Sequence, residues 1–225
     1  QEVVTGLQGV TDLPLQIDTS DPAAMEAAMR LYNGKPLVNS VNGKQESMDA
    51  VFPLAAKYGA MVVCLTLDEG GIPETAEGRV QIAEKIIKEA AKYGVPKKDL
   101  LIDTLAMAIS AGQENAASTL DALHYVRNTL KVHTTLGVSN ISFGLPQREK
   151  VNTAFFTIAL SKGLSAGIIN PNSGAMMAAY YAFCALDGSD AQCKGYIGYF
   201  SQQDGQPKEA GGSVGETTLF EAVVK

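Results

Sequence analysis

Acidic and amide side chains follow four apolar segments of this chain, at the point where each segment turns polar. Asp18 and Asp103 supply carboxylates, and Asn39 and Asn140 supply carboxamides. A carboxylate accepts hydrogen bonds from two neighbouring N–H groups, whereas an amide donates and accepts at once. No lysine, arginine or histidine stands immediately beside any of the four in sequence. The pattern therefore favours a neutral, donor-rich heterocycle over a phosphate ester as the ligand.

Short apolar strands alternate with helical segments along the chain, and this order predicts a parallel sheet built from βα units. The expected strands are residues 13–17, 36–38, 60–65, 100–102, 133–138 and 166–169. The expected helices are residues 22–33, 45–58, 75–93, 115–130, 148–162 and 174–186. Ser20 or Asp21 is suited to cap the first of these helices, and Pro22 fits its first turn.

Polar residues stand at the end of all six strands, and this distribution distinguishes two α/β architectures. The six residues are Asp18, Asn39, Asp68, Asp103, Asn140 and Asn170. A doubly wound sheet concentrates such residues at one switch point, whereas a barrel directs every strand end to one mouth. Residues 1–9 resemble the end of a helix. We therefore expect a (βα)8 TIM barrel of which this chain carries six βα units, with the first two units upstream of residue 1.

The composition changes after residue 200, where apolar residues become rare. Residues 201–216 are expected to form a linker, because they are rich in Gly, Gln and Ser and offer little to bury. Residues 217–225 are expected to begin the helix of a following domain. The predicted organisation is thus a barrel domain over residues 1–200, a linker over 201–216 and a helical domain that starts at 217.

Charge and composition exclude several classes of function. The chain has 225 residues, 46% of them apolar, and a net charge of −6. No basic run suggests binding to nucleic acid or to an anionic membrane, and no run of about 18 apolar residues suggests a transmembrane helix. No glycine-rich nucleotide loop follows a strand, and no His/Cys/Glu cluster has the spacing of metal ligands. Without a secretory signal, we expect a cytoplasmic protein.

Structural roles explain several other residues that could have suggested a site. Asp68 and Glu69, which precede Gly70-Gly71, fit a solvated turn, and Cys64 fits the interior of a strand. His124 is expected within a helix, and His133 at the amino end of a strand. Residues at that face of a barrel contribute to stability and not to catalysis. Any one polar strand end alone would most simply cap a helix or a loop. Four such residues at one mouth favour a binding site.

Four segments resemble a known family, the pterin-binding barrels of methyltetrahydrofolate methyltransferases. They are Leu13–Ser20 (LPLQIDTS), Lys35–Asn42 (KPLVNSVN), Leu101–Leu105 (LIDTL) and Leu136–Pro146 (LGVSNISFGLP). The likeness extends from residue 10 to about residue 200 and is greatest to the folate domain of cobalamin-dependent methionine synthases. Residues 201–225 resemble the lead into the helical cap that precedes the cobalamin domain in that family.

The resemblance implies a substrate and a role for each residue. The substrate would be 5-methyltetrahydrofolate, with Asp18, Asn39 and Asp103 on the polar edge of its pterin ring. Asn140 would lie near N5, the nitrogen that carries the methyl group, as the catalytic residue. The methyl acceptor would be cob(I)alamin on another domain or a corrinoid protein. This chain has neither the D-x-H-x-x-G segment of a cobalamin module nor a zinc site for homocysteine, so it should not bind cobalamin by itself.

Three other functions remain as alternatives. A free-standing methyltetrahydrofolate:corrinoid protein methyltransferase would use the same pterin pocket, although residues 201–225 favour a multidomain protein. An enzyme similar to dihydropteroate synthase expels diphosphate and needs basic residues at the last strand ends, where the sequence offers Ser139-Asn140 and Asn170-Pro171-Asn172. A degenerate barrel kept as a scaffold would not need all four polar residues.

Overall fold

The computed structural model describes residues 2–204. Its six parallel strands pair in the order β1-β2-β3-β4-β5-β6, so that each strand lies beside its neighbours in sequence. The strands are β1 (Gln16–Asp18), β2 (Leu37–Asn42), β3 (Met61–Leu65), β4 (Leu100–Asp103), β5 (His133–Gly137) and β6 (Ala166–Ile168). This sequential order confirms six βα units of a barrel-type sheet, because a doubly wound sheet would reverse its order at a switch point.

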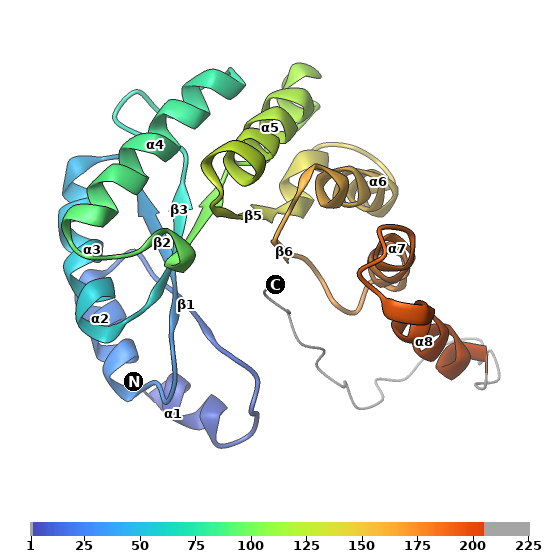
Figure 1. Cartoon of the computed structure of the whole chain (residues 1–225), viewed down its shortest axis with the longest axis horizontal. Coiled ribbons are helices and arrows are strands. Elements are labelled where there is room, and N and C mark those ends of the chain that lie inside the picture. Colours follow the sequence, from blue (N-terminus) through green and yellow to red (C-terminus); the bar gives the residue numbers. More distant parts are fainter. Residues whose placement is uncertain (1, 205–225) are drawn as a thin grey trace.

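Helices cover the outer face of this curled sheet. They are α1 (Glu2–Gln8), α2 (Pro22–Leu31), α3 (Gln45–Tyr58), α4 (Ala76–Lys92), α5 (Glu114–Tyr125), α6 (Arg148–Lys162), α7 (Gly174–Leu186) and α8 (Lys194–Asp204). Figure 1 shows α2 to α7 as an arc outside the strands, as expected when each crossover returns to the same face. The carboxyl ends of all six strands consequently lie at one edge of the sheet.

Local sequence signals set the helix boundaries. Asp21 caps α2 through its Oδ1, which accepts a hydrogen bond from Ala23 N, and Pro22 occupies the first helical position as predicted. Thr75 caps α4 in the same way by accepting from Gly78 N. Helix α3 ends at Gly59, whose φ of 64° is a left-handed conformation that glycine adopts at low cost.

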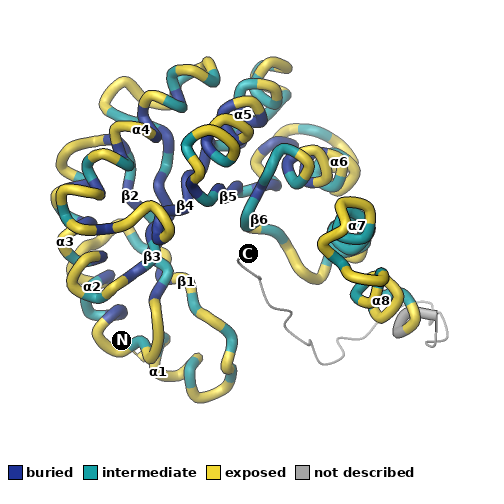
Figure 2. Tube along the Cα trace, in the orientation of Figure 1, coloured by how far each residue is buried: buried dark blue, intermediate teal, exposed yellow. Residues whose placement is uncertain are grey.

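The core lies between the sheet and the outer helices, and Figure 2 shows the central strands β3 and β4 as largely buried. Strand residues such as Val62 and Cys64 pack there against helix residues such as Phe52 and Ile86. The prediction that Cys64 lies buried within a strand is confirmed.

Three candidate residues face away from this core. Asp18, Asn39 and Asp103 each follow a core residue by one position, namely Ile17, Val38 and Ile102. Because successive side chains of a strand point to opposite faces, all three candidates project from the inner face of the curled sheet. The β-strand period therefore places the acids and the amide inside the barrel.

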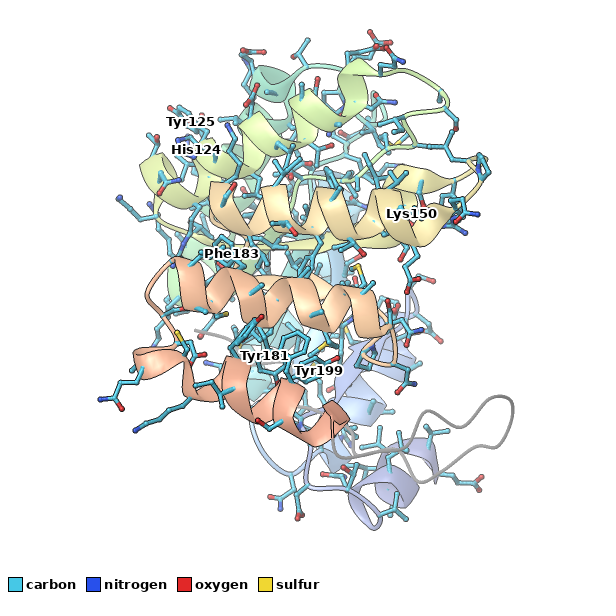
Figure 3. All side chains as sticks on the ribbon, turned by 90° about the vertical axis from the view of Figure 1, so that its right-hand side faces the viewer. His124, Tyr125, Lys150, Tyr181, Phe183 and Tyr199 are labelled. Atoms are coloured by element: carbon cyan, nitrogen blue, oxygen red, sulfur yellow. The ribbon has the colours of Figure 1, made fainter. Side chains whose placement is uncertain are left out.

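Helix α8 extends over residues 201–204, the first four residues of the segment that the sequence predicts as a linker. Asp190 orders the start of α8 by accepting from Gly195 N and Tyr196 N. Once a helix has begun, each added residue costs little, and a polar Ser-Gln-Gln run does not stop it. Tyr199 of α8 stacks on Tyr181 of α7, with ring centroids 4.5 Å apart (Figure 3). Residues 205–225, with the rest of the linker and the expected helix, lie outside the described residues.

Candidate functional site

Asp18 and Asn39 form a pair at the carboxyl ends of β1 and β2. The two residues are register partners in the sheet, and Asn39 Nδ2 donates to Asp18 Oδ2 over 3.3 Å. They line a cavity of about 420 Å³, and the peptide bond that follows Asn39 is cis. Lys44, from the turn before α3, lines the same cavity. The sequence prediction considered immediate neighbours only and so missed this cation.

Asp103 ends β4 and is buried, with 6% of its surface exposed. Its Oδ1 accepts a hydrogen bond of 2.8 Å from Leu105 N. Burial raises the pKa of Asp103 to about 6, while the backbone N–H groups of Leu105 and Gly137 and the charge of Arg79 act in the opposite direction. One carboxylate oxygen of Asp103 therefore already has a backbone partner. The carboxyl group changes between its neutral and charged forms at about pH 6.

Asn140 lies in a short 3₁₀ turn (Val138–Ser142) that directly follows β5. Its side chain folds back toward the strand, since a Cβ on Gly137 would lie only 3.0 Å from Asn140 Nδ2. The missing side chain of Gly137 leaves this space open. Gly137 also donates its N–H toward Asp103, so it lies against both Asp103 and Asn140.

The four candidates thus form two pairs on neighbouring strand ends. One pair is Asp18 with Asn39, on β1 and β2, and the other is Asp103 with Asn140, around Gly137. Asp103 and Asn140 do not line the cavity that Asp18 and Asn39 share. Strand β3, which ends at Leu65, lies between the two pairs.

The remaining polar residues have the structural roles that the sequence predicted. Asp68 Oδ1 accepts from Gly70 N in a turn, and His124 lies in α5 beside Asn128. His133 begins β5 next to Arg127, and burial lowers the pKa of its imidazole. None of these three residues lines the cavity that Asp18 and Asn39 share.

Sequence reasoning missed Arg79, a fully buried arginine in α4. Its Nη1 donates to Thr104 O, Leu105 O and Thr119 Oγ1 over 2.7–3.0 Å, and its Nε donates to Pro73 O over 2.9 Å. It thereby holds the loop that follows Asp103, in which Leu105 has a left-handed φ of 60°. A signal was present, because Arg79 shares its helix face with the buried apolar residues Ile82, Ala83, Ile86 and Ala90.

Sequence reasoning also missed Arg148, which begins α6. Its Nη2 donates to Ser139 O over 2.8 Å, its Nε donates to Ser142 Oγ over 3.0 Å, and its guanidinium lies 4.5 Å from the ring centroid of Phe143. A cation therefore does stand beside the end of β5. A positive charge in the first turn of a helix opposes the helix dipole, and that was the available signal.

Residues 2–204 lack two features that are often linked to other functions. No helix in this range is long and apolar enough to cross a membrane. No group of three or more His, Cys, Asp or Glu side chains within it is arranged to hold a metal ion. All three cysteines are free thiols.

Comparison with known proteins gives both family and fold neighbours. The family model for pterin binding enzymes matches residues 1–170. The methylcorrinoid:tetrahydrofolate methyltransferase of Eubacterium limosum is 34% identical over 207 residues, which is 91% of this chain and 76% of that protein. The methionine synthase of Mycobacterium tuberculosis is 35% identical over 171 residues, which is 70% of this chain but only 14% of that protein.

Solved structures with a similar fold include dihydropteroate synthases. The enzyme from Yersinia pestis has a TM-score of 0.61 and 18% identity, with 84% of this chain and 77% of that chain covered. The enzyme from Thermus thermophilus has the same TM-score and identity, and covers 84% of this chain and 74% of its own. At this level of identity the likeness establishes the barrel-type fold alone.

Proposed function

Because the chain belongs to the family of pterin-binding enzymes, we propose that it binds 5-methyltetrahydrofolate and presents the N5-methyl group to a corrinoid, cob(I)alamin. The corrinoid would be carried by another domain, as in methionine synthase, or by a separate protein. The observation that carries this proposal is that two acids and an amide lie on the inner face of β1, β2 and β4, with a second amide directly after β5. Methyltransferases among the relatives support it.

The chemistry of the pterin ring fits this set of side chains. One edge of the ring carries N–H donors beside a carbonyl oxygen, and carboxylates are good partners for such donors. Asp18 and Asp103 would accept these hydrogen bonds. Asn39 would bond to the part of the edge where an N–H donor stands beside the carbonyl oxygen. Asn39 already donates to Asp18, so its amide is held in a defined orientation before the ligand arrives.

Removal of the methyl group leaves an electron pair on N5, and an amine anion is a very poor leaving group. N5 must therefore gain a proton before or during the transfer. The amide of Asn140 cannot supply a proton at neutral pH, but its oxygen can accept a hydrogen bond from protonated N5 and so favour that form. A corrinoid held by another domain or protein would supply the nucleophile, while Asn140 would hold the proton on N5.

Titration calorimetry of the full-length protein with 5-methyltetrahydrofolate tests the proposal. We expect one binding site, and weaker binding in the variants Asp18→Ala and Asn39→Ala. The matched control is Asp68→Asn in the turn after β3, because Asp68 accepts from Gly70 N and does not line the cavity, so its replacement should leave affinity unchanged. If the protein did not bind this folate, or if it condensed a pterin diphosphate with p-aminobenzoate, the proposal would be wrong.

Folate affinity should depend on pH through Asp103. The carboxylate form of Asp103 accepts N–H groups, and its pKa is raised to about 6. The fraction in this form falls as the pH drops through 6, so Kd should be constant above about pH 7 and rise by about tenfold per unit below the pKa. Calorimetry between pH 5 and 8 measures this.

Asp103→Asn should bind weakly and lose this part of the pH dependence, while Asp68→Asn should keep it. If Asp103→Asn and the unaltered protein had the same pH profile of folate affinity, Asp103 would not be a binding residue.

A further inference from the structure

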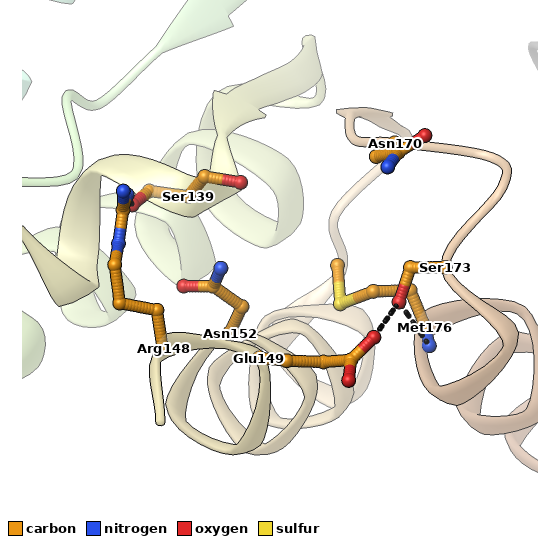
Figure 4. A pocket seen from close by; sticks show the side chains of 7 residues that line it. All are labelled: Ser139, Arg148, Glu149, Asn152, Asn170, Ser173 and Met176. Carbon is orange, nitrogen blue, oxygen red and sulfur yellow. Dashed lines mark hydrogen bonds between the residues drawn. The ribbon is translucent and has the colours of Figure 1, made fainter. Parts of the chain in front are cut away.

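A second cavity of about 260 Å³ lies at the ends of β5 and β6 and contains a cation that pairs with no acidic side chain of residues 2–204. Its lining includes Ser139, Arg148, Asn152 and Asn170, and Figure 4 shows these side chains around one opening. The ion pairs found in residues 2–204 do not include Arg148. Its bonds to Ser139 O and Ser142 Oγ hold the guanidinium in place without neutralising it. The cavity is thus suited to an anionic group.

Asn152 contributes an unsatisfied acceptor to the same cavity. Its Oδ1 is buried and is the one buried side-chain polar atom without a hydrogen-bond partner in the described part of the chain. An unpaired buried oxygen is destabilising, so a ligand N–H that reached it would gain an interaction that the free protein lacks. Arg148 and Asn152 are four residues apart on one helix and so share a face. They present a cation beside an acceptor.

Glu149 also lines the cavity, but on the other side of Asn152 from Arg148 (Figure 4). Its carboxylate accepts a hydrogen bond from the hydroxyl of Ser173, and that hydroxyl in turn accepts from Met176 N at the start of α7. Glu149 thus stabilises the capping residue of α7. The cavity has a cationic end at Arg148 and an acidic end at Glu149.

The position of the cavity relates it to folate chemistry. The benzoyl-glutamate tail of a folate is attached at C6, the ring atom bonded to N5, and therefore leaves the pterin at the end opposite its polar edge. The proposed site places that polar edge at Asp18, Asn39 and Asp103 and places N5 near Asn140. Ser139, the residue before Asn140, lines the second cavity. The tail would therefore leave the ring beside this cavity.

We propose that the second cavity binds the benzoyl-glutamate tail, with Arg148 pairing with a glutamate carboxylate and Asn152 Oδ1 accepting the benzamide N–H. This inference rests on the proposed function and adds a tail-binding subsite to it. The tail offers an amide donor and a carboxylate a few bonds apart, which complements an acceptor beside a cation. Glu149, at the other end, would limit the binding of additional glutamates.

The test compares ligands with and without the tail on the full-length protein. Kd is measured by calorimetry for 5-methyltetrahydrofolate and for 5,6-dimethyltetrahydropterin, which has the same ring and no tail. Arg148→Met should weaken binding of the folate about fivefold, as for a partly exposed ion pair, and should change binding of the pterin less than twofold. Asn152→Leu should weaken binding of the folate about threefold and leave the pterin unaffected.

Two further variants sharpen the comparison. Lys150→Met is the matched control, because it removes the same charge from the same turn of α6 at an exposed residue that does not line the cavity (Figure 3). It should affect neither ligand. Glu149→Gln should tighten binding of the triglutamate form of the folate about twofold. The loss caused by Arg148→Met should shrink in 0.5 M salt, because salt screens such pairs.

Equal losses for both ligands in Arg148→Met and Asn152→Leu would overturn the tail subsite, and so would no loss for either ligand. In both cases the pterin site itself would stand, because the unaltered protein would still bind the tail-less ligand. Failure of the unaltered protein to bind either ligand would instead overturn the proposed function, and the tail subsite with it.

Discussion

Replacing Asn140 with alanine should slow methyl transfer by about 100-fold or more while raising the Kd for 5-methyltetrahydrofolate less than tenfold. The reason is that protonated N5 exists mainly in the transition state, so an acceptor directed at N5 gains most of its interaction there. Asn140 is suited to this role because it lies directly after β5 and folds over Gly137, next to the end of β4. Rates come from single-turnover transfer to cob(I)alamin, and Kd from calorimetry.

Two variants control this experiment. Asn140→Asp keeps an acceptor at the same position, so it should retain more of the rate than Asn140→Ala. Asn172→Ala removes an exposed amide from the loop after β6 and should leave both the rate and Kd unchanged. Equal losses in rate and affinity for Asn140→Ala would indicate that Asn140 only binds the ring.

The second large effect should come from Arg79. Replacing it with methionine should lower the free energy of unfolding by about 3 kcal/mol, because the carbonyls of Pro73, Thr104 and Leu105 would lose a buried donor. Urea unfolding followed by circular dichroism measures the change. Lys88→Met is the control on the same helix, because Lys88 is exposed and a substitution there should cost less than about 0.5 kcal/mol.

Arg79 should also influence the site through Asp103. Its positive charge acts to lower the pKa of Asp103, so its loss should raise that pKa above its present value of about 6. The pH at which folate affinity begins to fall should then move upward in Arg79→Met, provided the variant is folded at the assay temperature. A purely structural arginine would leave this midpoint unchanged. An unshifted midpoint would therefore limit Arg79 to supporting the loop.

Local patterns in the sequence were sufficient to predict the six βα units. Strand and helix periods depend on neighbouring residues, and so do helix caps such as Asp21, one of the two residues that the sequence offered for the cap of α2. The strand period also determined which side of the sheet Asp18, Asn39 and Asp103 occupy, because each follows a core residue by one position. Helix α8 was not among the predicted helices, and its polar residues at 201–204 fit a helix and a linker equally.

The tertiary structure decided how these residues meet and which others join them. Only packing showed that Asp103 is buried and lies against Gly137 with Asn140, whereas Asp18 and Asn39 line a separate cavity. Arg79 and Arg148 reach the strand ends from helices, and no spacing along the chain specifies where a long side chain on a helix ends. The sequence by itself therefore determined the elements and the faces of the strands. The contacts that set the charge and protonation of the site arise only when helices and strands pack, because they join residues far apart in the chain.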